Sequence, residues 1–431
     1  MKTLHVGRRT RLRIGRNALS RLLAQMGSRL ISLVLVGVIT RYTGSVGLGR
    51  YVLITTVLTL STVFTDLGLG TLLTRETAAA PSLEEQRQLL GRLVPLRMAL
   101  AGLGAGLLLI LSALPVQRAA WNGLGPIAAL IGAALLPRAG FEFLSAFLNG
   151  LRRFDVSSSV SVAARLVALI GGTLALLRGY GVAAVVIASA AGDAVGIVVY
   201  VGILRAWQAL PRLKLSSAGW KQTLSTAYPF ALTGIIGVAY RRSDVLLLSA
   251  WQGDAAAGQY GAAYKLAETM GLIPASLLDV VFPEMAGLAS RPGGRERLRR
   301  TVRRAAPFLF LMGVALSAVG TVLAAPLVRL VYGIGGAPSG TVATFRLQLW
   351  AVPAMFLYLL NGHLLYVLGR QRLVTRAMAV VAAVNVALNL LVIPRWSALG
   401  VSGVSLISAF LLWLLLAAQA RRALCADEEA V

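Results

Sequence analysis

The feature that most constrains this fold is a series of twelve apolar segments separated by short polar stretches. They lie near residues 20–40, 51–73, 93–114, 124–148, 158–177 and 180–204, and again near 224–250, 257–282, 306–332, 342–368, 377–393 and 399–420. A helix needs about 20 mostly apolar residues to cross a bilayer, and it satisfies its own backbone hydrogen bonds there. The sequence therefore predicts an all-α polytopic membrane protein with twelve transmembrane helices.

Composition excludes the main soluble classes. Hydrophobic residues make up 57% of the chain and charged residues 13%, whereas an ordinary soluble domain has roughly a quarter charged residues. The net charge of +26 alone would suggest a nucleic-acid-binding protein. A water-soluble fold could not bury these apolar segments, however, so we expect no nucleic-acid partner. With Cys425 as the only cysteine and with His5 far from His363, we also expect no disulfide, metal site or cofactor.

The distribution of Lys and Arg predicts the orientation of the chain. If the N-terminus lies inside, 27 of the 42 cations fall in inward-facing segments and five in outward-facing ones, as the positive-inside rule requires. We therefore expect a multi-pass protein of the cell (inner) membrane with both termini in the cytoplasm. The inward segment 290–304 holds seven of these cations. It is interpreted either as a plain topological determinant or as an interfacial helix that touches anionic lipid.

The two sets of six segments show signs of an internal repeat. Gly49-Arg50-Tyr51 opens the second span, and Gly258-Gln259-Tyr260 opens the eighth span 209 residues later. Two similar halves are typical of alternating-access carriers, which bind their substrate between the halves. We therefore expect two six-helix lobes, the first formed by residues 1–210 and the second by residues 211–431.

Ten cations and seven acids lie in or near the apolar segments. Each costs at least a few kcal/mol at the bilayer centre, so such residues face protein or a water-filled cavity. Helical spacing predicts three ion pairs: Arg138 with Glu142, Arg241 with Asp244, and Lys265 with Glu268. For cations near segment ends, among them Arg97, snorkelling to the interface is an equal alternative.

Polar stripes on three spans predict a shared cavity with excess positive charge. On the first span, Arg21, Gln25 and Arg29 share one helix face, and no acid in that span neutralises the two arginines. The seventh and eighth spans carry similar lines that include Tyr240, Arg241, Asp244, Tyr260, Tyr264 and Glu268. Because Arg offers a fork of donors that matches phosphate oxygens, such a cavity suits an anionic, phosphate-bearing substrate.

The sequence lacks the common motifs of enzymes. It has no GxxxxGKS or GxxxxGKT loop, so the chain does not itself hydrolyse ATP, and it has no HExxH or GxSxG motif. The outward loops are short and contain Asp254 as their only acid, which argues against a polymerase or ligase acting on lipid intermediates. We therefore expect a transporter without catalytic residues; a purely structural assembly subunit is the alternative that the sequence leaves open.

Short motifs in a fixed order point to a family. They include Arg41-Tyr42-Thr43-Gly44, Gly47-Leu48-Gly49-Arg50-Tyr51, Asp66-Leu67-Gly68-Leu69, Tyr228-Pro229-Phe230, Arg242-Ser243-Asp244-Val245, Gly258-Gln259-Tyr260-Gly261, Phe282-Pro283-Glu284 and Asn385-Val386-Ala387-Leu388-Asn389. In their order and spacing they resemble the polysaccharide biosynthesis (Wzx-type) oligosaccharide flippases of the multidrug/oligosaccharidyl-lipid/polysaccharide (MOP) superfamily. The resemblance covers nearly the whole chain.

This resemblance implies a MATE-like fold and a flippase. Such a carrier moves polyprenyl-diphosphate-linked oligosaccharide from the inner to the outer leaflet for assembly of cell-surface polysaccharide such as O-antigen. It adds two residues to the candidates for substrate binding, which are then Arg21, Gln25, Arg29, Tyr240, Arg241, Arg242, Tyr264 and Lys265. The candidates for coupling to H⁺ or Na⁺ are Asp66, Asp244 and Glu268.

The expected partners are the lipid-linked oligosaccharide, membrane lipids and polysaccharide polymerase or assembly proteins. Two members of the same superfamily are the alternatives. A lipid II flippase is chemically close, but that group usually has fourteen spans. A multidrug exporter carries cationic drugs and typically has a carboxylate in the first span, where this chain has arginines.

Overall fold

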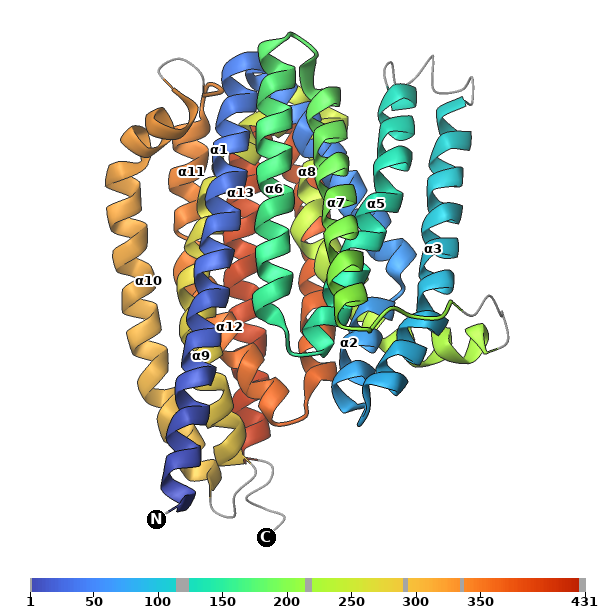
Figure 1. The fold of residues 1–431 in the computed structure, drawn as a ribbon. Coiled ribbons are helices and arrows are strands. Elements are labelled where there is room, and N and C mark those ends of the chain that lie inside the picture. Colours follow the sequence, from blue (N-terminus) through green and yellow to red (C-terminus); the bar gives the residue numbers. More distant parts are fainter. Residues whose placement is uncertain (1, 114–123, 214–218, 290–293, 334–336, 426–431) are drawn as a thin grey trace. The chain divides into compact units, whose positions relative to one another are not determined.

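The structure is a computed structural model that describes residues 2–113, 124–213, 219–289, 294–333 and 337–425. Within these ranges the regular secondary structure is entirely α-helical (Figure 1). The description does not extend to the side chains of residues 2–25 and of several residues between 272 and 284. The all-α prediction is confirmed.

The helices follow the order of the apolar segments. The first half of the chain forms α1 (Lys2–Asp66), α2 (Leu69–Ala79), α3 (Leu83–Ala113), α5 (Leu124–Gly150), α6 (Phe154–Leu177) and α7 (Gly181–Ala206). The second half forms α8 (Trp220–Met270), α9 (Leu272–Ala289), α10 (Gly294–Tyr332), α11 (Thr341–Leu349), α12 (Val352–Val367) and α13 (Gln371–Cys425).

Three of these helices contain a break. The backbone leaves helical geometry at Gly44 of α1 (φ 67°, ψ −166°), at Gly253 of α8 (φ 78°, ψ 179°) and at Ser397 of α13 (φ 46°, ψ −134°). Positive φ is cheap only for glycine, which explains the residue type at two of the breaks. At 65, 51 and 55 residues, the three helices are far longer than one crossing of a bilayer requires.

The breaks account for the number of spans. By length and composition, seven described helices could cross a membrane, or eight if α11 and α12, bent by 42°, form one span. α8 is not among the seven, because polar and charged residues interrupt its apolar sequence. When α1, α8 and α13 are divided at their breaks and α9 continues the second part of α8, the described helices provide the twelve predicted spans.

The chain separates into two units by its internal contacts. The first contains Met1–Tyr42 and Ile54–Ile235, and the second contains Thr43–Leu53 and Ile236–Val431. The α1 helix and the α8 helix therefore each contribute to both units. The lobe boundary that we expect between residues 210 and 211 stays a prediction, because units of contact are not the same as lobes of six helices.

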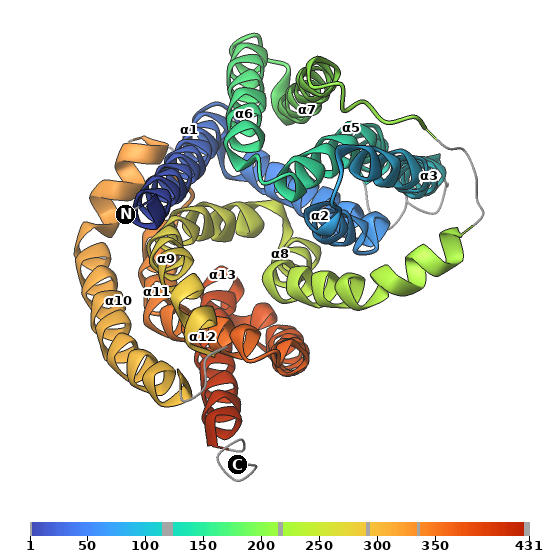
Figure 2. The ribbon, with the colours of Figure 1, turned by 60° about the horizontal axis from the view of Figure 1, so that its bottom comes forward.

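Each unit has its own apolar core. In the first unit, the short helix α2 places Leu69, Leu72 and Leu73 against α3, α5 and α7, where Phe147 and Tyr200 are fully buried. The α6 and α7 helices lie side by side in both views (Figures 1 and 2). In the second unit, α12 and both parts of α13 pack around Leu364, Leu365 and Leu412. Many large apolar side chains outside these cores are exposed, as expected for a surface in contact with lipid.

Candidate functional site

A close helix contact in the second unit joins the two sequence repeats. It forms between the Thr43–Leu53 segment of α1 and the second part of α8. A Cβ atom on Gly49 would lie 1.7 Å from the carbonyl oxygen of Asp254, and one on Gly258 would lie 2.2 Å from that of Ser45. Gly49 and Gly258 are 209 residues apart, and so are Ser45 and Asp254. The contact is therefore reciprocal, like an interface with two-fold symmetry.

The polar side chains around this contact break the symmetry. Arg50 Nε lies 3.1 Å from Asp254 Oδ2, and Ser249 Oγ donates to Asp254 Oδ1 at 3.2 Å. The repeat counterpart of Arg50 is Gln259, whose Nε2 instead donates to Thr344 Oγ1 at 2.9 Å. The ion pair therefore ties the α1 segment to α8 at one of two equivalent positions only.

Asp244 is the most enclosed acid on α8. Its side chain is 4% exposed, and its carboxylate accepts hydrogen bonds from the Tyr260 hydroxyl and, at 2.7 Å, from the backbone N–H of Val245. Tyr260 Oη also lies 3.3 Å from Ser405 Oγ of α13. Because Asp244 and Tyr260 stand on opposite sides of the break at Gly253, this cluster connects both parts of α8 to α13.

The α8 helix carries an aromatic and cationic face one turn further along. The Tyr260 and Tyr264 rings stack with centroids 5.9 Å apart, and the Arg242 guanidinium lies 5.4 Å from the centroid of Tyr264. Lys265 Nζ donates to Glu268 Oε2 at 3.1 Å. The predicted Lys265–Glu268 pair is confirmed. Arg242 and Tyr264 thus meet across the break in α8, within the second unit.

The predicted pair of Arg241 with Asp244 is wrong. Among the described residues no ion pair joins them, because the Asp244 carboxylate is turned toward Tyr260. Arg241 is exposed, and its guanidinium lies beside Gly237 and Met378. Tyr240 is half-buried against the apolar core that α12 and α13 form. Arg241 is therefore a cation that Asp244 does not neutralise.

The α13 helix contains a buried chain of hydrogen-bonded polar side chains, and none of them was among the predicted site residues. Asn389 Nδ2 donates to Asn385 Oδ1 at 2.9 Å, and Asn385 Nδ2 donates to Ser408 Oγ at 3.0 Å. Asn389 Oδ1 is buried and has no hydrogen-bond partner within the described chain. The spacing of the two asparagines in an apolar segment was the available signal, and they belong to the motifs that carry the family resemblance.

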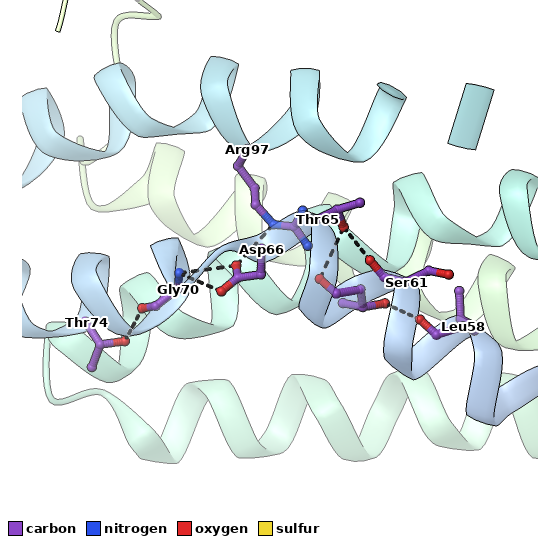
Figure 3. Close-up of polar contacts among 8 residues, drawn as sticks. Leu58, Ser61, Thr65, Asp66, Gly70, Thr74 and Arg97 are labelled. Carbon is purple, nitrogen blue, oxygen red and sulfur yellow. Dashed lines mark hydrogen bonds and ion pairs between the residues drawn. The ribbon is translucent and has the colours of Figure 1, made fainter. Parts of the chain in front are cut away.

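In the first unit, Asp66 forms an ion pair with a buried arginine (Figure 3). It ends α1, and both carboxylate oxygens accept from the N–H of Gly70 at 3.2 Å. Arg97 Nε of α3 lies 3.3 Å from Asp66 Oδ1 without hydrogen-bond alignment, and Arg97 Nη1 donates to Thr65 Oγ1 at 3.2 Å. The Arg97 side chain is 1% exposed. The snorkelling alternative for Arg97 is therefore wrong.

A second charged group lies between α5 and α7. Arg138 Nη2 is 2.6 Å from Glu142 Oε1, which confirms the predicted pair, and Arg138 Nη1 is 3.6 Å from Asp193 Oδ1. Arg138 thus forms ion pairs with two carboxylates within the first unit. Sequence spacing did not indicate Asp193, because it lies on another helix.

The structure describes only part of the predicted stripe on the first span. Arg29 lies on α1 in the first unit and is half-buried, whereas the side chains of Arg21 and Gln25 lie outside the described residues. Arg29 and Asp66 belong to one unit and the α8 candidates to the other. A cavity that they share therefore stays a prediction.

The fold matches solved structures of membrane transporters. One is entitled "Lipid II flippase MurJ, inward closed conformation" and is 16% identical to this protein, with a TM-score of 0.77. The match covers 93% of this chain and 87% of the MurJ chain. An inward-facing multidrug resistance MATE family transporter of the MOP superfamily is 13% identical with a TM-score of 0.72, over 96% and 99% of the two chains. The bent form of the Vibrio cholerae MATE transporter VcmN is 16% identical with a TM-score of 0.52, over 96% and 99%.

The protein is thus a multi-span membrane protein with the fold of the MOP transporters. A family model described as polysaccharide biosynthesis protein matches residues 14–288. The chain belongs to this family, and the resemblance that its motifs carry is confirmed. No protein in the curated set matches the chain.

Proposed function

We propose that the protein flips polyprenyl-diphosphate-linked oligosaccharide from the inner to the outer leaflet, for assembly of cell-surface polysaccharide. The observation that carries the proposal is the family match, which extends from residue 14 in α1 to residue 288 and so contains all of α8. We further propose that the chain transports without catalysis, that it resides in the inner membrane and that both termini are cytoplasmic. The distribution of Lys and Arg between the apolar segments supports this orientation.

Charge on the candidate residues supports a phosphate-bearing substrate. Asp244 is bonded to Tyr260 and does not neutralise Arg241, and Arg242 contacts the uncharged ring of Tyr264. Arg241 and Arg242 therefore leave a positive excess on α8 that a diphosphate would balance. Arg29 on α1 is the third arginine of the proposed set. Aromatic rings beside the arginines, at Tyr240 and Tyr264, suit the sugar and polyprenyl parts of such a lipid. Arg21, Gln25 and Lys265 complete the proposed binding set.

Two sources of free energy are proposed for the transport step. An inside-negative potential favours outward movement of a dianion by about 4.6 kcal/mol per 100 mV. Coupling to H⁺ or Na⁺ is assigned to Asp244 before Glu268 and Asp66. The reason is that Glu268 is already neutralised by Lys265, and Asp66 by Arg97. The side-chain hydrogen-bond partner of Asp244 is instead an uncharged hydroxyl.

A lipid II flippase is the second candidate, because the MurJ structure matches with a TM-score of 0.77. Lipid II also carries a polyprenyl diphosphate, so the same arginines would bind it. A multidrug exporter is a weaker candidate, since an excess of arginines would repel a cationic drug. A polysaccharide polymerase or assembly protein remains the proposed macromolecular partner.

The test is leaflet exposure of labelled lipid-linked oligosaccharide in proteoliposomes. Changing Arg29→Ala together with Arg242→Ala removes two proposed phosphate donors. A charge-assisted hydrogen bond contributes about 1.5–3 kcal/mol, so we expect transport at limiting substrate to fall by about 100-fold or more.

The matched control removes two exposed cations, with Arg178→Ala in the turn after α6 and Arg395→Ala in α13 close to its break. It should leave transport within about twofold of the unchanged protein, because exposed charges contribute little. Unchanged transport in the Arg29/Arg242 variant would exclude the diphosphate role of these residues. Equal losses in both variants would indicate a general effect of charge instead.

A further inference from the structure

A basic pocket opens in the second unit where α10 begins and α13 ends. Figure 2 shows the start of α10 beside the last turns of α13. The cavity has a volume of about 600 Å³ and is lined by α10, α12 and α13. Arg299 and Arg303, one turn apart on α10, and Arg421 on α13 supply its charge. We refer to it as the α10–α13 pocket.

The pocket has a polar level and an apolar level. Arg299 and Arg303 precede the apolar part of α10, which starts at Ala305, and Arg421 follows the apolar part of α13. Cations at the ends of apolar spans lie at the membrane interface. Phe310, Leu364 and Trp413 line the pocket from residues further inside the spans. The arginines therefore stand at headgroup level and the apolar walls at acyl-chain level.

Arg303 and Arg421 of the α10–α13 pocket are not balanced by an ion pair in the part of the chain that the structure describes. No described Asp or Glu is among the lining residues of the pocket. Among ion pairs between described residues, none involves Arg303 or Arg421, and the nearby acid Glu296 pairs with Arg300 at 3.2 Å. Three cations around one cavity favour an anionic ligand, and basic pockets between transmembrane helices are known sites for anionic headgroups.

We propose that the α10–α13 pocket binds an anionic phospholipid of the leaflet on its side of the membrane. The phosphate lies among the three arginines, and one acyl chain lies along Phe310 and Trp413. None of the proposed substrate residues on α8 lines this pocket, and the proposal does not rest on the proposed transport function. It also distinguishes between the two interpretations of segment 290–304, since a topological determinant requires charge but no cavity.

A competing occupant is the acidic end of the chain, where Asp427, Glu428 and Glu429 follow α13 in the sequence. Its charge would also complement the arginines. The apolar walls favour the lipid, because the six residues 426–431 offer them no apolar side chain larger than that of Val431.

The experiment measures lipids bound to the purified full-length protein by native mass spectrometry. Phosphatidylglycerol is compared with phosphatidylcholine of the same acyl chains. The pocket variant carries Arg299→Gln, Arg303→Gln and Arg421→Gln. Its matched control carries Arg297→Gln, Arg304→Gln and Arg422→Gln, which remove the same charge from the same two helices outside the pocket.

We expect the pocket variant to bind phosphatidylglycerol about tenfold more weakly or worse, and the control to stay within about twofold. Ala417→Trp, which fills the cavity and keeps every arginine, should also weaken binding of phosphatidylglycerol. Deleting residues 426–431 should leave it unchanged.

Three results would overturn the proposal. Equal losses in the pocket variant and its control would reduce the site to general surface charge. Unchanged binding in the Ala417→Trp variant would show that the cavity is not used. A rise in lipid binding after deletion of residues 426–431 would identify the acidic end of the chain as the natural occupant.

Discussion

At the residue scale, local spacing predicted contacts correctly only where both partners lie on one helix. The pairs Arg138–Glu142 and Lys265–Glu268 are three or four residues apart, so helical geometry alone brings them together. Arg241 and Asp244 have the same spacing, but a hydroxyl from beyond the break in α8 takes the carboxylate. The sequence could not reveal that competition.

The buried state of Arg97 shows the same limit. Its acid, Asp66, lies 31 residues earlier at the end of α1. Near a span end, snorkelling and burial give the same sequence pattern, and only the packing of α3 on α1 and α2 decides between them. An unpaired Arg at this depth would cost several kcal/mol.

At the level of single residues, we predict the effect of removing the charge of Asp244. Changing Asp244→Asn keeps the shape of the side chain and removes its charge, while the amide oxygen still accepts from Tyr260. If Asp244 binds the coupling ion, transport in proteoliposomes should lose its dependence on H⁺ or Na⁺ gradients and keep its dependence on membrane potential.

The matched control for Asp244→Asn is Glu268→Gln, whose carboxylate is already neutralised by Lys265. This variant should keep the ion dependence of the unchanged protein. Retention of full ion dependence in Asp244→Asn, with normal folding by thermal unfolding, would show that coupling lies elsewhere. Loss of ion dependence in Glu268→Gln alone would assign coupling to Glu268.

At the element scale, the apolar segments predicted the helices, because the cost of exposing backbone in lipid leaves little choice. The breaks at Gly44 and Gly253 lie in the predicted gaps between spans, at 41–50 and 251–256. That the helix continues on both sides of a single glycine was not predicted, since glycine is also common in unbroken transmembrane helices. The repeat of Gly49-Arg50-Tyr51 in Gly258-Gln259-Tyr260 was visible in the sequence, but its physical meaning was not. In the structure the repeated glycines allow a close reciprocal contact between two helices, because Gly49 faces the backbone of Asp254 and Gly258 faces the backbone of Ser45.

The reciprocal contact predicts a specific effect of added methyl groups. Gly258→Ala places a Cβ atom 2.2 Å from the Ser45 carbonyl oxygen, which must push the two helices apart. Overpacking of this kind costs about 1–3 kcal/mol, so we expect a lower thermal unfolding temperature. Cross-linking of cysteines placed at Arg50 and Asp254, in a Cys425→Ser background, should become less efficient.

The control for Gly258→Ala uses helical glycines with open space around them. Gly102→Ala and Gly202→Ala meet no atom within 4 Å, and they should stabilise the protein by up to about 1 kcal/mol by favouring helix. If Gly258→Ala raised the unfolding temperature as these variants do, the close contact between α1 and α8 would not exist.

At the scale of the whole molecule, the charge of +26 combines signals with different physical origins. Most cations lie in the segments between spans, where they predict orientation. The remainder includes structural pairs such as Arg97 and Arg138, and the exposed or ring-stacked arginines of α8. The fold class and family could be predicted from sequence because they depend on apolar pattern and motif order. Whether Arg29 and Arg242 face one cavity depends on the arrangement of the two units, which no local pattern encodes.

The proposed transport of a lipid-linked oligosaccharide is tested against its two alternatives in one experiment. The experiment compares three compounds in proteoliposomes that contain the unchanged protein: polyprenyl-diphosphate-linked oligosaccharide, lipid II and a cationic dye. Outer-leaflet exposure, or for the dye its transfer across the membrane, is measured with and without an inside-negative potential. We predict that the oligosaccharide lipid is flipped fastest and that the potential accelerates it. Faster transport of lipid II or of the dye, or no transport of the oligosaccharide lipid, would contradict the claim.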